Sequence, residues 1–391
     1  MKSISEARVA IVFEWFQHFG GVELVVAEML EAFPGADLFA LVHDPHNLTG
    51  TPLEGVPVRT SFIQHLPWAK EKYRSYLPLM PLAVEQLDLR PYDLVISSSH
   101  TVAKGVLTRA DQLHVSYTHT PVRYAWDLYQ DYLSQSGLDR GAKGWLARVV
   151  LHYLRLWDVS AANRVDRYLA NSSYVAQRIT KLYRRPAQVI HPPTDIDCYR
   201  HDLPRGEFFV TVSRLVPYKR LDLIVEAFGR MNKPLVVIGD GPERAKLERA
   251  AGPKVKLLGY QPEEVIIDHL QRARAFVFAA HEDFGIAPVE AQAAGCPVIA
   301  YGRGGVLETV VGWPAPDATG VFFDVQTPEA LEEAVELFEA RECEFAPEAC
   351  RRNAEYFGRR ERFRREFRAS VEELWDRFRR GKELERRIPC S

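Results

Sequence analysis

Two glutamates with seven residues between them stand in the most informative segment, His281 to Glu290, which reads HEDFGIAPVE. An apolar run precedes this segment, a glycine follows Phe284, and Pro288 suits the first turn of a helix. The N–H groups and the dipole of a helix N-terminus favour an anion, while Glu282 and Glu290 offer acceptor oxygens to hydroxyl groups. This arrangement suits a sugar and a ribose joined by phosphates. The plainer interpretations are a solvated charge for Glu282 and a helix-dipole partner for Glu290.

Two cations lie in a second segment, Ser213 to Arg220, which reads SRLVPYKR and follows an expected strand. Arg214 offers a planar fork to phosphate oxygens and Lys219 offers a compact charge, so the pair suits a diphosphate leaving group. The alternative is that both are isolated surface cations, which would not indicate a phosphate-binding site.

Glycine turns follow two expected strands. Gly239 to Pro242 reads GDGP and could bring the backbone at Gly241 close to a ligand, and Gly20 and Gly21 join the first strand to the first helix. Plain tight turns are the alternative in both places. The sequence contains no complete G-x-G-x-x-G and no G-x-x-x-x-G-K-[ST], which disfavours dinucleotide dehydrogenases and P-loop enzymes.

A histidine ends one expected strand in the first half of the chain. His119 follows the run 113–118 and precedes an aromatic-rich segment. An imidazole at a strand end can bind a sugar hydroxyl, but a lone histidine is more often a structural residue. Both interpretations stay open on sequence alone.

The elements that must position these residues alternate along the whole chain between short β-branched runs and longer helical patterns, which predicts βαβ units and parallel sheets. Strands are expected at 8–14, 36–42, 93–97, 113–118, 167–170, 188–191, 208–213, 235–239, 255–259, 275–279, 297–300 and 320–324. Helices are expected at 22–33, 122–133, 145–163, 173–183, 219–230, 243–250, 262–272, 288–294 and 328–337. Turn and breaker residues at 192–206 predict a linker between two doubly wound domains, with a ligand cleft between them that domain closure would shut.

Two amphipathic stretches allow a choice between packing and membrane contact. Residues 351–387 hold 14 basic and 8 acidic residues with an apolar stripe, and predict a helix or helix pair that packs back across the domains. Residues 145–157 are strongly apolar with basic and aromatic flanks, and core packing is the first interpretation. The alternative for 351–387 is attraction to an anionic membrane surface, and the alternative for 145–157 is a monotopic contact with a lipid-linked acceptor.

Composition limits the class of protein. The chain has 391 residues, 47% apolar and 26% charged, and a net charge of −2, which is typical of a globular protein of two or three domains and disfavours a nucleic-acid clamp. No apolar run approaches membrane-spanning length, and the N-terminus does not resemble a secretory signal, so we expect a cytoplasmic location. Five scattered cysteines without a C-x-x-C pair indicate neither a disulfide framework nor a zinc site.

The second half resembles a known enzyme family over about a hundred residues. Residues 212–222, 238–243, 282–290, 294–300 and 304–305 are similar, in order, to the group 1 (family 4) retaining glycosyltransferases of GT-B fold. The first half is similar more loosely, around Gly20 and Gly21 and around His119. The resemblance implies an α/β protein with two facing Rossmann-like, doubly wound domains: an acceptor-side domain at 1–191, a donor domain at 207–355, and a helical segment at 356–391 that packs back on the first.

The resemblance also implies roles for individual residues. Glu282 would contact the donor sugar and Glu290 the nucleotide ribose, while the leaving phosphate would help to take the acceptor proton during same-face attack. The implied catalytic residues are His119, Arg214, Lys219 and Glu282, and the implied donor-binding residues are Gly20, Gly21, Gly241, Phe284, Gly285, Ile286 and Glu290. The family works without a metal or another cofactor.

The segment HTPVRYAWD, which begins at His119, is further similar to mannosyltransferases of bacterial O-antigen, capsule or exopolysaccharide synthesis. This favours GDP-mannose as donor, with UDP-glucose or another UDP-sugar as the alternative, and a glycan or lipid-linked glycan as acceptor. A peripheral contact with the inner face of the cell membrane and the absence of nucleic-acid partners complete the expectation. Sugar-nucleotide epimerases, phosphorylases and non-catalytic nucleotide-sugar-binding proteins are the competing classes.

Overall fold

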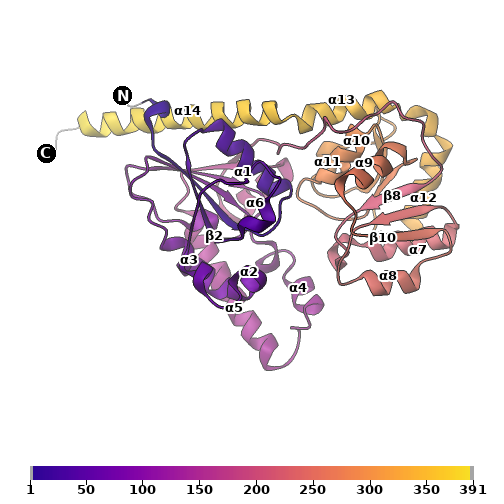
Figure 1. Ribbon diagram of the computed structural model, residues 1–391, viewed down its shortest axis with the longest axis horizontal. Coiled ribbons are helices and arrows are strands. Elements are labelled where there is room, and N and C mark those ends of the chain that lie inside the picture. The colour runs from indigo at the N-terminus through magenta and orange to yellow at the C-terminus, as the bar shows by residue number, and fades with distance from the viewer. Residues whose placement is uncertain (1–2, 388–391) are drawn as a thin grey trace. The chain divides into compact units, whose positions relative to one another are not determined.

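The computed structural model describes residues 3–387, without the side chains at 131, 135 and 382–387. The chain divides into two compact units: unit 1 comprises Met1–Pro193 and Arg360–Ser391, and unit 2 comprises Thr194–Arg359 (Figure 1). Each unit is built around its own parallel β-sheet.

Unit 1 holds a parallel sheet of seven strands among the described residues, in the order β3-β2-β1-β4-β5-β6-β7. The strands are β1 (Val9–Phe16), β2 (Asp37–His43), β3 (Val58–Thr60), β4 (Leu94–Ser99), β5 (Leu113–Thr118), β6 (Arg167–Ala170) and β7 (Ala187–Val189). The helices are α1 (Gly21–Ala32), α2 (Ala69–Lys72), α3 (Met80–Glu85), α4 (Tyr129–Gln135), α5 (Gly141–Ala162), α6 (Ser173–Tyr183) and α14 (Arg360–Arg387). One core lies between the sheet and helices α1 and α14, and a second lies on the other face with α3 and α5.

Unit 2 repeats this plan with six parallel strands in the order β10-β9-β8-β11-β12-β13. The strands are β8 (Phe209–Val212), β9 (Leu235–Ile238), β10 (Val255–Gly259), β11 (Phe276–Phe278), β12 (Val298–Tyr301) and β13 (Gly320–Phe323). The helices are α7 (Leu221–Met231), α8 (Arg244–Ala250), α9 (Glu263–Arg272), α10 (Ile286–Ala293), α11 (Val306–Thr309), α12 (Pro328–Ala340) and α13 (Pro347–Gly358). Helices α7 and α12 cover one face of the sheet, and α9, α10 and α13 cover the other.

Both sheets have the Rossmann strand order, in which the chain starts in the middle, builds outward to one side, and then returns to build the other side. The central strands are buried on both faces; every residue of β4 and β5, for example, is buried. Helices cover both faces of these strands, so polar side chains such as Ser97, His114 and Ser116 are buried as well and make hydrogen bonds to other side chains. The prediction of two Rossmann-like α/β domains is therefore confirmed.

The predicted helix at 122–133 is wrong in its first half. Residues Arg123–Ala125 form only a 3-10 turn, and α4 begins at Tyr129. Tertiary hydrogen bonds hold this segment: Trp126 Nε1 donates to Asp158 of α5 at 2.8 Å, and Arg155 donates to the Ala125 carbonyl at 3.0 Å. The short elements β3, α2, α3 and α11 lie outside the predicted ranges, because elements this short leave little periodicity to detect. Helix α13 begins at Pro347, ahead of the predicted helical stretch 351–387.

The predicted linker at 192–206 is mostly anchored to unit 2. The Arg205 guanidinium donates to four backbone carbonyls, those of Leu270, Gln271, Ala273 and Ala294. Arg351 of α13 donates to the carbonyls of Ile196 and Tyr199 at 2.8 and 3.1 Å. The chain therefore crosses between the units at Pro193–Thr194 and again at Arg359–Arg360, outside these anchored residues.

The C-terminal amphipathic stretch forms a helix pair, and its apolar stripe is shared between the units. Phe357 of α13 belongs to a core of unit 2, whereas Phe363, Phe367 and Trp375 of α14 are buried in a core of unit 1. Figure 1 shows α14 beside α1, against which it packs. The apolar stripe of α14 is occupied by unit 1, so the membrane alternative for this stripe is excluded.

Candidate functional site

The predicted donor-site residues of unit 2 lie at the point where the strand order of its sheet reverses. Strand β8 has β9 on one side and β11 on the other, and the loops after β8 and β11 leave from the same edge of the sheet. In doubly wound sheets this edge is where ligands bind. Arg214 and Lys219 belong to the first loop, and Glu282 and Phe284 belong to the second.

Lys219 and Glu282 form an ion pair that joins the two loops. Their side chains are 18% and 20% exposed, so both are largely withdrawn from water but still reachable. Lys219 closes the 3-10 turn Pro217–Lys219, and its ammonium also lies 5.6 Å from the centre of the Tyr218 ring. The structure thus brings together two residues that are far apart in sequence, at the position where the sequence predicted a diphosphate and a sugar.

Arg214 lies in the same loop but is exposed, and within residues 3–387 its guanidinium makes no hydrogen bond or ion pair. The next residue, Leu215, is buried and fixes the backbone: its N–H donates to the Asp240 carbonyl and its carbonyl accepts from the Glu243 N–H, both at 3.0 Å. A Cβ at Gly241 would lie 2.4 Å from the Leu215 oxygen. Gly241 is therefore required for the contact between two loops, which explains it without a ligand.

The loop after β11 is held by the loop after β12. The Gly305 N–H donates to the Glu282 carbonyl at 2.9 Å, and a Cβ at Gly304 would lie only 2.3 Å from that same oxygen. The Phe284 ring is buried and packs edge-on against Phe357. Buried anchors of this kind leave the backbone of Phe284, Gly285 and Ile286 in a fixed position.

Glu290 lies one turn inside α10, because this helix begins at Ile286, two residues earlier than predicted. The interpretation of Glu290 as a first-turn partner of the helix dipole is therefore wrong. Its carboxylate is partly buried and accepts no hydrogen bond from the described residues. Burial raises the pKa of Glu290 to about 7, and the nearby charges of Glu263 and Asp195 act in the same direction.

The other predicted site residues belong to unit 1. Gly20 precedes α1 and Gly21 is its first residue. His119 follows β5 and is 7% exposed; its Nε2 lies 2.8 Å from Ser98 Oγ, and its N–H donates to the Ser99 carbonyl. Burial lowers the pKa of His119 to about 3, which keeps the ring neutral. These bonds account for His119 as a structural residue, and its contact with a donor sugar stays a prediction.

A charged pair that was not among the predicted site residues lies where the strand order of the unit 1 sheet reverses, between β1 and β4. Glu14 of β1 is fully buried, and its Oε2 lies 3.1 Å from Nδ1 of His100, which follows β4. Its Oε1 accepts four successive backbone N–H groups at 2.8 to 3.0 Å, from His100, Thr101, Val102 and Ala103. Two signals were available: a charged residue inside the apolar run AIVFEWF, and the polar run SSSH at the end of the next strand.

Charge and hydrogen bonding set the ionisation of this pair. Burial alone would raise the pKa of Glu14, but the His100 charge and the backbone N–H groups lower it to about 2. Burial alone would lower the pKa of His100, but the Glu14 carboxylate raises it. Glu23, in the first turn of α1, is also buried, and burial raises its pKa to about 7. Unit 1 therefore holds a charged, water-poor cluster beside the turn formed by Gly20 and Gly21.

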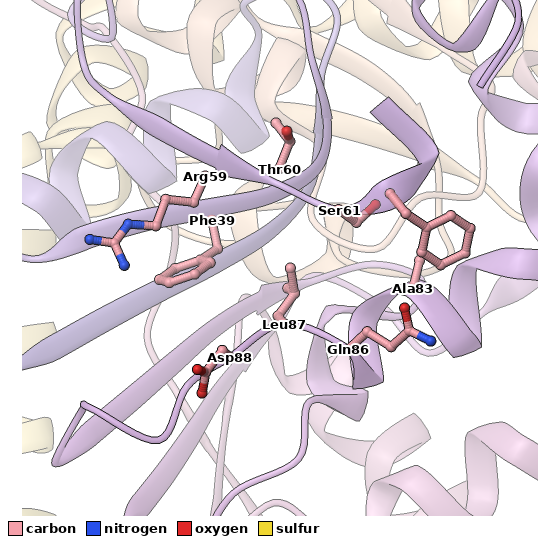
Figure 2. A pocket seen from close by; sticks show the side chains of 9 residues that line it. Phe39, Arg59, Thr60, Ser61, Ala83, Gln86, Leu87 and Asp88 are labelled. Atoms are coloured by element: carbon pink, nitrogen blue, oxygen red, sulfur yellow. The ribbon is translucent and has the colours of Figure 1, made fainter. Parts of the chain in front are cut away.

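Two cavities lie away from these loops. A cavity of about 230 Å³ opens between β2, β3 and α3, and Figure 2 shows Phe39, Arg59 and Ala83 around it. A second, of about 550 Å³, lies beside α7 and α8 in unit 2. Neither cavity is lined by a predicted site residue.

The described residues form neither a metal-binding cluster nor a membrane-spanning helix. Residues 3–387 contain no group of three or more His, Cys, Asp or Glu side chains placed to hold a metal ion. Over the same residues, no helix combines the length and the apolar character that crossing a bilayer requires.

Fold and site together define a two-domain α/β protein of the Rossmann type, with a lysine–glutamate pair at the ligand-binding edge of its second sheet. Family models match both halves: "Glycosyltransferase Family 4" over residues 19–197 and "Glycosyl transferases group 1" over residues 201–357. Each half of the chain thus matches a glycosyltransferase model, and the two matches together support a group 1 glycosyltransferase.

Curated relatives are similar over part of their length. D-inositol 3-phosphate glycosyltransferase of Mycolicibacterium smegmatis is 27% identical over 170 residues, which is 37% of this chain and 39% of the relative. The enzyme of the same name from Nocardia farcinica is 31% identical over 177 residues, with the same shares. The chain thus spans about two fifths of the length of these relatives.

Solved structures are similar over nearly the whole chain. HepE of Anabaena, solved in complex with UDP, has a TM-score of 0.67 and 16% identity, and the match covers 94% of this chain and 100% of that one. Sucrose-phosphate synthase of Thermosynechococcus elongatus has a TM-score of 0.69 and 16% identity, covering 94% and 99%. At this identity the likeness shows the fold, and that fold is GT-B.

Proposed function

We propose that this protein transfers a hexose from a nucleoside-diphosphate sugar to a hydroxyl of a glycan or lipid-linked glycan, with retention at the anomeric carbon and without a metal. The observation that carries the proposal is the Lys219–Glu282 ion pair at the ligand-binding edge of the unit 2 sheet. It places a cation for phosphate and an acceptor for sugar hydroxyls on two adjoining loops.

Lys219 and Arg214 stabilise the leaving group. When the bond between the anomeric carbon and the phosphate oxygen breaks, the electron pair stays on the diphosphate, and its negative charge grows in the transition state. A lysine ammonium has three donors, so Lys219 can retain Glu282 and still donate to phosphate. Arg214 is exposed and brings a second charge that no described carboxylate neutralises. Fixed cations at the growing charge stabilise the transition state more than the bound donor.

The acceptor oxygen forms its bond to the anomeric carbon on the face that the diphosphate leaves, and the acceptor proton passes to the departing phosphate. The carboxylates bind and orient the donor. Glu282 accepts sugar hydroxyls, and Glu290, whose carboxylate has no partner among the described residues, accepts ribose hydroxyls. The backbone at the start of α10, fixed by Phe284 and Gly304, supplies N–H groups to the phosphates.

GDP-mannose is the proposed donor, on the strength of the segment that begins at His119, and its use in cell-surface polysaccharide synthesis follows from the same segment. A UDP-sugar is the second candidate. HepE was solved with UDP-glucose as well as with UDP, but that likeness concerns the fold and leaves the base of this chain's donor to experiment.

A donor panel tests the proposal directly. Thermal unfolding is measured with GDP-, UDP- and ADP-sugars, because a ligand that binds the folded state raises the unfolding temperature by mass action. The stabilising donor is then incubated with glycan acceptors, and NMR of the product gives the anomeric configuration, with and without a chelator.

Each outcome of this panel decides between classes of protein. Transfer with retention in the presence of chelator supports the proposal. If GDP-mannose is the only tested sugar nucleotide that stabilises the protein, the result supports GDP-mannose as the donor. Inversion, or loss of activity in chelator, contradicts the proposed mechanism. Conversion of the donor without acceptor identifies an epimerase, and binding without turnover across the acceptor panel identifies a nucleotide-sugar-binding protein.

A further inference from the structure

Helix α5 has two unlike faces. One face packs into a core of unit 1 through Leu151, Leu154 and Trp157, and Trp157 Nε1 also donates to Glu85 of α3 at 2.8 Å. Asp158 is fully buried and pairs with the buried Lys104. Core packing, the first interpretation of this segment, therefore accounts for half of the helix and anchors it rigidly.

The other face of α5 carries an exposed apolar stripe. Trp145, Leu146 and Leu156 are 67%, 57% and 61% exposed, and Val149 and Tyr153 are also exposed. Positions 146, 149, 153 and 156 follow the three- and four-residue steps that keep side chains on one side of a helix. The stripe from 146 to 159 extends about 20 Å along the helix axis at 1.5 Å per residue.

The charged residues on the exposed side of α5 are basic. Lys143 and Arg148 are exposed and Arg155 is partly buried, while Asp139, which precedes the helix, is half-exposed and its carbonyl accepts from Arg148. Asp158 is the single acidic residue in α5, and it lies in the core. An apolar stripe with aromatic residues and flanking cations, without an exposed carboxylate on the helix, complements an anionic lipid surface.

We propose that the exposed face of α5 docks on the surface of an anionic lipid bilayer, with the helix lying in the plane of the interface. Trp145 and Leu156 enter the boundary between headgroups and acyl chains, and Lys143 and Arg148 meet anionic headgroups. Because the opposite face of α5 is packed on the sheet of unit 1, the helix lies on the membrane and does not cross it. This binding does not depend on the sugar chemistry proposed above, since it concerns a different surface.

Helix α14 shows why α5 is the membrane candidate. Both helices are amphipathic and rich in basic residues, but α14 buries its apolar stripe in unit 1 and pairs its arginines with glutamates along the helix, as in Arg362–Glu366 and Arg368–Glu372. Helix α5 leaves its stripe exposed and its exposed cations without acidic partners on the helix.

Vesicle flotation of the full chain tests the proposal. Vesicles of phosphatidylcholine with about 30% phosphatidylglycerol, and vesicles of phosphatidylcholine alone, are compared at low and high salt. The variant Trp145→Ser/Leu156→Ser removes two exposed apolar side chains. The matched control Tyr356→Ser/Val325→Ser removes an aromatic and an aliphatic side chain that are 67% and 58% exposed in unit 2.

We expect the wild type and the control to float with anionic vesicles, salt to weaken binding, and the α5 variant to bind at least about tenfold more weakly. Circular dichroism and the unfolding temperature verify that the variants fold. Absence of flotation for the wild type, or equal flotation of the α5 variant and the control, overturns the proposal. If the wild type is instead a dimer that only the α5 variant dissociates, the stripe binds a second copy of the chain, and the membrane assignment is wrong.

Discussion

The two sheets reverse their strand order in the same way, but the two reversal points are filled differently. In unit 1, the backbone N–H groups after β4 converge on Glu14, which belongs to the neighbouring strand β1. In unit 2, the corresponding loops are joined by Lys219 and Glu282, which remain partly exposed, and Arg214 stands beside them. Unit 1 has satisfied its N–H groups with an internal anion, whereas in unit 2 Arg214 and Lys219 are the cations proposed to bind an external one.

This difference teaches that topology alone does not make a nucleotide site. The strand order brings the same backbone features to both edges, but a single buried carboxylate decides whether they are available. We therefore propose unit 2 as the unit that binds the diphosphate. The pair Glu14–His100 is proposed to stabilise unit 1.

The largest effect is expected from the cations of unit 2. Lys219→Ala and Arg214→Ala should each lower turnover by about 10² to 10³, the loss found when one fixed donor to a growing negative charge is removed. Steady-state transfer rates measure this effect. Lys256→Ala, which removes an exposed lysine on β10, should leave turnover unchanged. Unchanged turnover in the Lys219 and Arg214 variants would contradict the proposal that unit 2, unlike unit 1, binds an external diphosphate.

The next effect is expected in unit 1. Glu14→Gln keeps one acceptor oxygen but loses the charge, so the free energy of unfolding at pH 7 should fall by about 2 kcal/mol. Urea unfolding measures it, and Glu71→Gln, at an exposed position, serves as the control. Because the pKa of Glu14 is lowered to about 2, its contribution is present above its unfolded value and is lost as pH falls toward 2. A Glu14→Gln protein as stable as wild type would show that the internal anion is not needed.

Glu23 should make unit 1 less stable as pH rises. Its pKa is about 7 in the folded chain and 4.5 as the reference for the unfolded one. Between these values only the unfolded state loses the proton, so stability falls across this window and stays low above it. Glu23→Gln should match wild type at pH 4 and exceed it by about 1 to 3 kcal/mol at pH 8 in urea unfolding. A constant difference at all pH values would show that Glu23 does not titrate in this window.

The smallest effect concerns donor binding at Glu290. In the proposed site the carboxylate form of Glu290 accepts ribose hydroxyls, and because its pKa is about 7, much of Glu290 is protonated below neutrality. Donor affinity should therefore rise by up to about tenfold per pH unit below pH 7 and level off above it. Calorimetric titration of a nucleotide sugar measures this, with Glu290→Gln expected to flatten the profile. Inorganic pyrophosphate, which has no ribose, should respond equally in both proteins. An unchanged profile in the variant would remove Glu290 from the ribose site.

The alternation of short apolar runs and helical patterns along the sequence was sufficient to predict both sheets. The apolar runs 275–279 and 297–300 overlap β11 and β12, because central strands covered by helices on both faces need continuous apolar sequence. The segment HEDFGIAPVE likewise indicated a strand, a loop and a helix in the correct order, although α10 begins two residues early. Short elements such as β3 gave no signal.

Site residues were predictable where a local motif carries the chemistry. Lys219 and Glu282 were found in their own loops, but their ion pair depends on β8 and β11 becoming neighbours. Glu14 was missed for the same reason: its partners follow a strand that is 80 residues away in sequence and adjacent only in the sheet.

By itself, the sequence determined the α/β class, the two Rossmann-like sheets and the loops that carry the candidate donor residues, since apolar periodicity and turn residues act over a few positions. Only the tertiary structure decided that the apolar stripe of α14 is buried while that of α5 is exposed, and that unit 1 fills its own anion site with Glu14. Burial and pairing depend on which distant segments become neighbours, and a local pattern of residue types does not contain that information.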